Sequence, residues 1–360
     1  MLKKLSLAAL VAMGSMSVAS ATDLSQAIKG VNLKGFLRLR AYTDSDKTYT
    51  TRWRTTTALN FTVPVSNEVQ FHTDFAYDWS MYNDATTNTG SALPSYGNTH
   101  MFLSFAKDGA NVMLGKVPVS TPVTGSGVGE ALGAGVIATY AVNKDLTLAA
   151  AGLDTLANTD QVTVGGKNTY AAAAIFGIKD LVNAQVWAFE VDGIINYDYV
   201  VRADVTALKD KGIALHVDYA TADLDGAQYK QSYANVNASF KVKEVCAKVG
   251  FAATGKNGGT VTLDVDSPLS VINSTEQVYS ITDTAGNRAY YAKLGYQVDP
   301  KTNVYAAYTH TDDSGVEGLV GAKYQYTKKF GVKVYYSALK GEGSTKTGNR
   351  EARAEFKYTF

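Results

Sequence analysis

Apolar and polar side chains alternate one position at a time along most of the chain, in stretches of roughly ten residues. In residues 69–79 the odd positions carry Val, Phe, Thr, Phe, Tyr and Trp, while polar residues such as Gln70, His72 and Asp78 occupy even positions. Successive side chains of a β-strand point to opposite faces, so this pattern predicts strands with one apolar and one polar face. Residues 213–219 and 332–338 show the same alternation.

Short polar turns and longer polar loops separate these stretches in turn. The short turns are 64–68, 107–111, 142–145, 179–183, 209–212, 241–244, 299–302 and 327–331. The longer loops are 43–50, 80–98, 118–133, 155–168, 192–196, 221–230, 254–286, 312–315 and 340–349.

Eight turns and nine loops separate 18 strands, and this arrangement is typical of an all-β, antiparallel transmembrane barrel with short periplasmic turns and longer extracellular loops. A soluble β-sandwich shows similar alternation in shorter strands. Sixteen strands remain an alternative, because residues 182–191 and 303–309 alternate poorly.

Composition agrees with this interpretation. The chain has 23 Tyr and 32 Gly but only 6 Pro, and tyrosine suits the boundary between lipid and water because its apolar ring carries a polar tip. The formal net charge is +1, which gives no global basic surface for nucleic acid. The single cysteine, Cys246, excludes a disulfide within the chain.

The first 21 residues have the pattern of a secretory signal peptide. Lys3 and Lys4 precede an apolar stretch, and Ala-Ser-Ala at 19–21 fits a cleavage site. We therefore expect cleavage before Thr22 and one barrel domain over residues 22–360. A membrane anchor is the alternative, but the apolar stretch is short and interrupted by Gly and Ser. No later apolar run reaches the roughly 18 residues that a spanning helix requires.

The C-terminal stretch, residues 350–360, predicts a final strand that ends on an aromatic residue. Its apolar face carries Ala352, Ala354, Phe356, Tyr358 and Phe360. A terminal aromatic strand of this kind is common in outer-membrane barrels. The alternative is an ordinary amphipathic strand that happens to lie at the terminus.

The start of the expected mature chain resembles one family closely. Residues 22–31 read TDLSQAIKGV, and residues 35–40 read GFLRLR. This opening is similar to that of the Campylobacter-type (epsilonproteobacterial) major outer membrane porins. The resemblance is sharp over roughly 20 residues and diffuse beyond them. It implies an 18-stranded barrel among outer-membrane lipids, a homotrimer, and a diffusion pore that favours cations.

A barrel of 16 to 18 strands encloses a water-filled channel, whose narrowest point and lining charges govern flux. The loop at 118–133 is the best candidate for a segment that folds inward, because it is rich in Gly and Ser. It carries one acid, Glu130. The alternative is a mobile external loop.

Arginines on the lipid face cost roughly 2–4 kcal/mol each near the midplane, so we expect the strand arginines to face the lumen. The candidates alternate with apolar neighbours, and they are Arg38, Arg40, Arg52, Arg54, Arg202 and Arg353, with Lys293 and Lys357. A basic wall facing Glu130 would create a transverse field across the constriction. The alternative is that these charges solvate the lumen and pair with acids, including Asp74, Asp78, Asp204 and Glu355.

The sequence supports two other kinds of chemistry, metal binding and catalysis, less well. Clustered carboxylates can bind Ca²⁺, and the loop at 254–286 holds four acids, namely Asp264, Asp266, Glu276 and Asp283. Their spacing matches no defined calcium loop, so we expect solvated acids and no cofactor. The pairs His72–Asp74 and His216–Asp218 lie on strand faces without a nucleophile motif, so we expect no enzyme.

The sequence therefore predicts an outer-membrane porin for the passive diffusion of ions and small polar solutes. Two alternatives stay open: a barrel that acts mainly as an adhesin or structural protein, and a channel specific for one solute.

Overall fold

The computed structural model describes most of the expected barrel domain. The described residues are 30–44, 49–84, 90–91, 95–97, 99–125, 131–208, 211–273, 275–278, 280–341 and 348–360. The expected signal peptide and Glu130 lie outside them.

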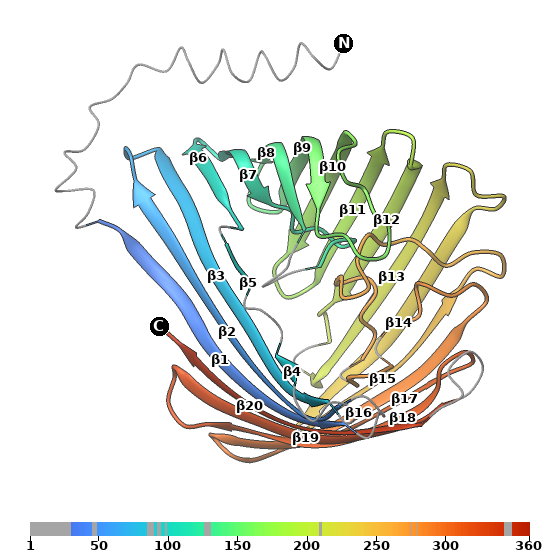
Figure 1. The fold of residues 1–360 in the computed structure, drawn as a ribbon. Helices are drawn as coiled ribbons and strands as arrows, with labels where there is room; N and C mark the ends of the chain where they lie inside the picture. The colour runs from blue at the N-terminus through green and yellow to red at the C-terminus, as the bar shows by residue number, and fades with distance from the viewer. Residues whose placement is uncertain are drawn as a thin grey trace.

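The described residues form a single antiparallel sheet (Figure 1). Its strands are β1 (Asn32–Asp44), β2 (Tyr49–Pro64), β3 (Val69–Asp84), β4 (Gly90–Ser91), β5 (Ser95–Gly97), β6 (Met101–Lys107), β7 (Ala110–Pro118), β8 (Leu132–Ala141), β9 (Leu146–Ala157), β10 (Thr169–Ile178), β11 (Val182–Val191), β12 (Ile195–Val205), β13 (Ile213–Leu224), β14 (Gln231–Val242), β15 (Val245–Thr254), β16 (Arg288–Asp299), β17 (Thr302–Thr311), β18 (Gly315–Gln325), β19 (Phe330–Lys340) and β20 (Asn349–Thr359).

Eighteen of these strands form the wall, because β4 and β5 are short pieces that pair only with β3. The predicted 18 strands are confirmed. The two stretches that alternate poorly are β11 and β17, so the alternative of 16 strands is wrong. We call the end of the barrel with the short connections the turn end, and the opposite end the loop end.

The sheet closes on itself. Each long strand pairs with the next, and β1 pairs with both β2 and β20. The last residue takes part, since Gly35 and Phe360 exchange backbone N–H···O hydrogen bonds of 3.3 and 3.1 Å. Among the described residues every long strand has a partner on each side, as a sheet in lipid requires, and β3 reaches β6 only through Val69–Thr73. Among the described residues, no helix is long and apolar enough to cross a membrane.

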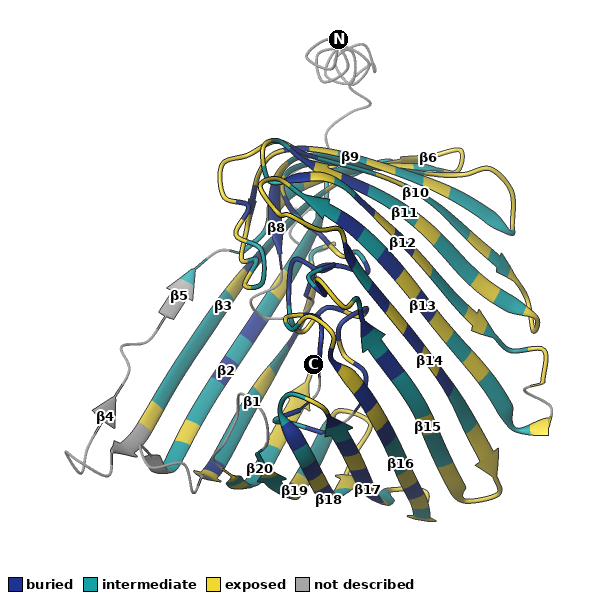
Figure 2. Ribbon diagram, turned by 90° about the vertical axis from the view of Figure 1, so that its right-hand side faces the viewer, coloured by how far each residue is buried: buried dark blue, intermediate teal, exposed yellow. Residues whose placement is uncertain are grey.

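The outward face of the wall is apolar. In β13, Leu215, Val217 and Tyr219 are 39%, 45% and 51% exposed, whereas Asp218 between them is buried. Figure 2 shows this banding of exposed and buried residues along strand after strand. A lipid-facing surface with polar residues turned inward explains the alternation seen in the sequence.

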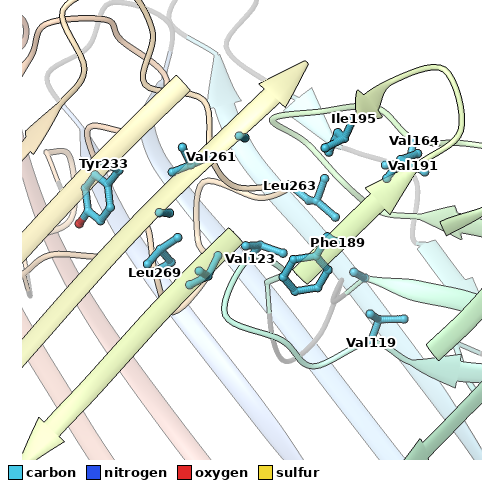
Figure 3. Close-up of a cluster of buried hydrophobic side chains, with 14 of the residues drawn as sticks. Val119, Val123, Val164, Phe189, Val191, Ile195, Tyr233, Val261, Leu263 and Leu269 are labelled. Atoms are coloured by element: carbon cyan, nitrogen blue, oxygen red, sulfur yellow. The ribbon is translucent and has the colours of Figure 1, made fainter. Parts of the chain in front are cut away.

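Two segments from the loop end enter the barrel and pack together. One is residues 119–125; the other, residues 255–287, is called the inward segment below. Leu263 donates its N–H to the Val123 carbonyl oxygen at 2.8 Å, and Leu269 donates to Pro122 at 2.9 Å. Their apolar side chains form a buried cluster with Phe189 of the wall (Figure 3).

The inward position of residues 119–125 agrees with the sequence interpretation, but the external position expected for residues 254–286 is wrong. The reason lies in its apolar residues rather than its acids. Val261, Leu263, Leu269, Ile272 and Ile281 are all at most 3% exposed. Burying each stabilises the inward position by roughly 1.5–3 kcal/mol relative to exposure in water.

Candidate channel constriction

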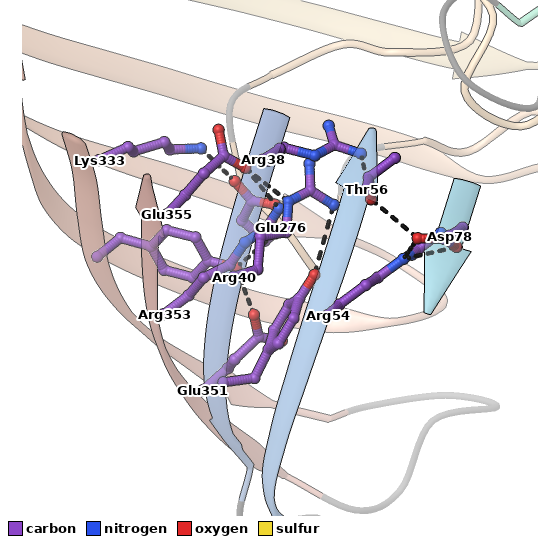
Figure 4. A network of polar contacts seen from close by, with 12 residues as sticks. Arg38, Arg40, Arg54, Thr56, Asp78, Glu276, Lys333, Glu351, Arg353 and Glu355 are labelled. Atoms are coloured by element: carbon purple, nitrogen blue, oxygen red, sulfur yellow. Dashed lines mark hydrogen bonds and ion pairs between the residues drawn. The ribbon is translucent and has the colours of Figure 1, made fainter. Parts of the chain in front are cut away.

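A carboxylate from the inward segment meets basic side chains of the barrel wall inside the lumen. Glu276 Oε1 accepts a hydrogen bond from Lys333 Nζ at 2.6 Å, and its Oε2 accepts one from Arg353 Nη1 at 3.0 Å (Figure 4). Glu355 links Arg353, at 3.4 Å, to Arg40, at 2.6 Å. The network therefore joins the inward segment to β19, β20 and β1.

A cavity of about 530 Å³ opens beside this network. The wall contributes five cations to its lining: Arg40, Lys293, Lys323, Lys333 and Arg353. The inward segment contributes the acids Asp266 and Glu276, with Asn273 and Thr275. The lining thus sets a basic wall against a mainly polar segment, and positive charge is in excess.

Tyr305 organises two of the lysines. Its ring lies 5.2 Å from Lys293 Nζ and 5.7 Å from Lys323 Nζ, which is cation–π range. Gly321 faces Tyr305 in the cross-strand register, and a Cβ at Gly321 would overlap the tyrosine ring. The glycine thus lets the ring lie flat on the wall, so that both ammonium groups stay at the cavity.

Glu317 of β18 anchors the tip of the inward segment. It is fully buried, and its carboxylate accepts backbone N–H bonds from Glu276 (3.1 Å), Gln277 (2.9 Å) and Val278 (2.7 Å). Ser337 also donates its hydroxyl to Glu317 at 2.5 Å. Hydrogen bonds to a charged acceptor are the stronger kind, so this anchor fixes where Glu276 lies.

Other contacts hold the segment along the wall before it reaches that tip. Asn273 Nδ2 donates to the Tyr308 carbonyl oxygen at 2.9 Å, and Thr275 bonds with Thr309 at 2.8 Å. Lys248 Nζ donates to the Ile272 carbonyl oxygen at 3.0 Å. The inward segment is therefore docked on the inner faces of β15 to β19.

Several of the site residues predicted from sequence come together here. Arg40 and Arg353 belong to the Glu276 network. Next to them in the wall, Arg54 donates to both oxygens of Asp78, at 2.9 and 2.6 Å. Thr56 bonds with Asp78 at 2.9 Å and accepts from Arg38 at 3.5 Å.

Arg52 borders the same network, because its Cζ lies 4.3 Å from the centroid of the Tyr42 ring and Arg353 Cζ lies 4.9 Å from that centroid. The remaining predicted residues lie elsewhere. Asp74 is buried and accepts the Thr99 N–H at 2.9 Å, so it holds the start of β6. Arg202 pairs with Asp218 at 2.7 Å on β12 and β13.

The acids of the inward segment differ from the solvated set that we expected. Asp264 is 3% exposed and Glu276 is ion-paired, whereas Asp266 and Asp283 are exposed. Among the described residues, no group of three or more His, Cys, Asp or Glu side chains is placed to hold a metal ion. The acid that faces the basic wall in the structure is Glu276, from the segment expected outside.

The structure also shows which groups the two histidines of the predicted pairs contact. His216 is bonded to Asp204 through Nδ1 and to Asp218 through Nε2, both at 2.7 Å. Because both acceptors are carboxylates, the ring carries both protons. His72 bonds with Ser104 at 2.7 Å and Thr62 at 3.2 Å, rather than with Asp74.

A small acidic cluster joins the inward segment to residues 119–125 and to the connection after β9. Asp264 accepts the Gly125 N–H and, at 3.1 Å, the Asp160 N–H, and Asp160 accepts the Val265 N–H at 2.9 Å. Loss of surrounding water raises the pKa above the ordinary 3.8 for Asp264, which is buried, and for Asp266, whose side chain is still open to solvent on one side. The nearby Asp160 carboxylate raises each pKa further.

This cluster gives the junction a pH dependence. Since the pKa values are raised in the docked state, docking binds protons and strengthens as the pH falls through the raised values toward 3.8. We expect the Leu263 and Leu269 amides to exchange hydrogen more slowly at about pH 5 than at pH 7, after correction for intrinsic rates. Faster corrected exchange at the lower pH would contradict this.

Comparisons with known proteins agree with this geometry. The sequence model of the Campylobacter major outer membrane protein family matches residues 1–166. The family resemblance is confirmed over those residues. No curated protein matches the chain significantly.

Solved structures extend the similarity of fold over nearly the whole chain. Pseudomonas aeruginosa OccK5 (OpdH) is 14% identical, with a TM-score of 0.71 over 92% of this chain and 98% of that one. OccK3 (OpdO) from the same organism is 14% identical, with a TM-score of 0.72 over 94% and 97%. Acinetobacter baumannii OccAB4 is 13% identical, with a TM-score of 0.71 over 92% and 98%. The chain is an outer-membrane β-barrel protein with a porin-like architecture.

Sequence reasoning missed Glu276 as the facing acid, Glu317 as its anchor, and Lys323 and Lys333 as lining cations. One signal was present for Glu317, because it alternates with Leu319, Gly321 and Lys323 on the inward face of its strand. Nothing in the sequence indicates its partners, which lie about 40 residues earlier in the chain.

Proposed function

We propose that this protein is a porin that forms a water-filled channel for the passive diffusion of ions and small polar solutes, without catalysis. The observation that carries the proposal is the cavity between the wall cations and Glu276. The inward segment narrows the lumen at this point, and docked residues 119–125 support it. Lining charges at a constriction govern which solutes pass.

The lining favours anions in this proposal. Five cations and two acids line the constriction cavity, an excess of three positive charges. A second cavity, of about 880 Å³, lies toward the turn end and is lined by Lys241, Lys243, Lys248 and Lys293. Lys293 lines both cavities, so the positive wall continues toward that end. This preference is opposite to the cation preference that the family resemblance implies.

Swelling of liposomes that contain the purified protein tests diffusion directly. We expect swelling in neutral sugars that slows steeply as the sugar grows, because the constriction sets the size limit. Liposomes without protein are the control. Swelling that is absent for the smallest sugars, with a correctly folded barrel, would overturn the porin proposal.

We further propose that three barrels associate as a homotrimer through the outward face of β8 to β10. The part of that face nearer the loop end carries mainly small side chains, namely Ala134, Val136, Ala138, Ala150, Gly152, Ala172 and Ala174, whereas Tyr140, Leu148 and Phe176 point outward nearer the turn end. In lipid, association depends on close packing, which small side chains allow.

A bulky substitution on this face tests the trimer. A Cβ at Gly152 meets nothing within 4 Å, so Gly152→Trp fits the folded barrel and blocks only close approach of a second copy. We expect the variant to sediment as a monomer where the wild type sediments as a trimer. Val217→Trp, on the outward face of β13, is the matched control. Unchanged trimers in Gly152→Trp would place the interface elsewhere.

A further inference from the structure

The cavity of about 880 Å³ toward the turn end differs from the constriction in its charge, and we call it the lysine cavity. It lies against the inner faces of β13 to β17, which are neighbouring strands of the wall (Figure 1). Its described lining includes Lys241, Lys243, Lys248 and Lys293 but no carboxylate and no arginine. The constriction cavity, by contrast, includes two acids of the inward segment. The lysine cavity therefore gathers positive charge without an acid in its lining.

Two of these lysines face each other directly. Lys248 of β15 and Lys293 of β16 are cross-strand partners in the register of the sheet. Each follows or precedes an outward residue, Val249 and Leu294, which are 49% and 55% exposed, so both lysines point into the lumen. Like charges directly opposite each other on one face of a sheet destabilise it. An anion bound between the two ammonium groups removes that repulsion.

Lys241 and Lys243 add a second pair at the turn between β14 and β15. Lys241 lies directly opposite Cys246, and Cys246 precedes Lys248 by two residues on the inward face of β15. At about 3.3 Å per residue, the two pairs lie at levels about 7 Å apart. Among the described residues, neither Lys241 nor Lys243 has a carboxylate within ion-pair distance. One solute with two adjacent anionic groups can therefore contact both pairs.

Small side chains form the floor between the two pairs. Cys246 lies opposite Gly295, and Ser239 lies opposite Lys248, so these positions adjoin one another on the inner face of the wall. All three of the small residues line the cavity. They keep its volume open, and Ser239 adds a hydroxyl donor beside the ammonium groups.

We propose that the lysine cavity binds solutes that carry a diphosphate group. A lysine ammonium is a compact point charge that suits phosphate oxygens, whereas the planar arginine fork is the better match for a carboxylate. A phosphoryl group also presents more acceptor oxygens than a carboxylate does. One phosphoryl group binds between Lys248 and Lys293, and the other binds beside Lys241 and Lys243.

The proposal rests on the channel function in one respect, since a solute that enters at the loop end reaches this cavity through the lumen. It adds to that function a preference among anions. The positive charge of the constriction attracts any anion, whereas two lysine pairs at separate levels favour two linked phosphoryl groups.

Calorimetric titration of the protein in nanodiscs of zwitterionic lipid tests the site, with pyrophosphate as the probe in buffer without divalent cations. We expect saturable binding of one molecule per chain. Citrate carries a similar negative charge on carboxylates, and we expect it to bind about tenfold more weakly or worse. Equal affinity for the two anions would show general attraction of negative charge and overturn the proposal, as would no binding of pyrophosphate.

Removing the pair at the turn tests where pyrophosphate binds. Lys241→Gln combined with Lys243→Gln should weaken its binding by about tenfold or more, as loss of charged hydrogen bonds implies. Lys144→Gln combined with Lys328→Gln is the matched control, because it removes two positive charges from exposed turns outside the cavity lining. An equal loss of affinity in the two double variants would show that overall charge decides binding, and would overturn the site.

Cys246 reports binding at this place without any substitution. It is the single cysteine of the chain, it is exposed, and it lies in the cavity floor. Saturating pyrophosphate should slow its alkylation by N-ethylmaleimide, an uncharged reagent, several-fold. Unchanged alkylation in protein saturated with pyrophosphate would place the anion elsewhere and contradict the proposal.

Conductance separates this proposal from the channel function. A conducting barrel that does not bind pyrophosphate overturns the binding site alone. A barrel that binds the probe as described but does not conduct overturns the porin function alone.

Discussion

Replacing Glu317 with Ala is expected to release the tip of the inward segment from the wall. Three backbone N–H groups lose a buried carboxylate, at about 1 kcal/mol or more each, so docking of the tip weakens by roughly 3 kcal/mol. The backbone amides of residues 276–278 should then exchange hydrogen much faster. Single-channel conductance should rise and become noisier, because Glu276 no longer holds a fixed place beside Lys333 and Arg353.

Two matched variants test whether the effects of Glu317→Ala come from loss of the anchor. Ser337→Ala removes one of the four donors to the Glu317 carboxylate and should show a smaller effect in the same direction. Glu68→Gln breaks an exposed ion pair with Lys107 at a turn, and should change neither exchange nor conductance. If Glu317→Ala retains wild-type exchange at residues 276–278, then Glu317 does not anchor the segment.

Reversing one lining charge should change which ions pass. Lys323 faces the constriction cavity, and no carboxylate of the described residues lies within ion-pair distance of its ammonium group. Lys323→Glu replaces a positive lining charge with a negative one, so the excess of positive charge falls from three to one. The reversal potential in a salt gradient should therefore shift toward cations.

Lys328→Glu provides the control, since it makes the same change of net charge in an exposed turn outside the lumen. Screening over about 8–10 Å in ordinary salt should leave the reversal potential of that variant unchanged. Equal shifts in the two variants would show that overall charge, rather than the described cavity, decides ion preference.

The wall of the barrel could be predicted because strand periodicity and turn chemistry are local properties of the chain. Even β11, with its poorly alternating sequence, pairs in register with β10 through residues such as Trp187 and Ala173. Its alternation is obscured because Trp187 and Phe189 face inward, onto the apolar side chains of residues 117–123. When the inner face of a strand is also apolar, its sequence no longer alternates between apolar and polar residues.

The lumen could be predicted only in part, for a different physical reason. Lipid penalises an outward arginine, so the inward direction of Arg40, Arg54 and Arg353 follows from sequence. The partner of each charge depends on which loop folds inward, and that depends on contacts between distant residues such as Val123 and Leu263. The acids of residues 254–286 suggested a solvated loop, although its buried apolar residues determine its position.

The central claim is that the inward segment narrows the lumen without closing it. Single-channel recording of the purified protein in a planar bilayer, under a salt gradient, tests this most directly. We predict steady stepwise openings, with a reversal potential that favours anions because positive charge is in excess around the cavity beside Glu276. A correctly folded barrel that conducts no current would mean that the inward segment plugs the lumen, and would contradict the account.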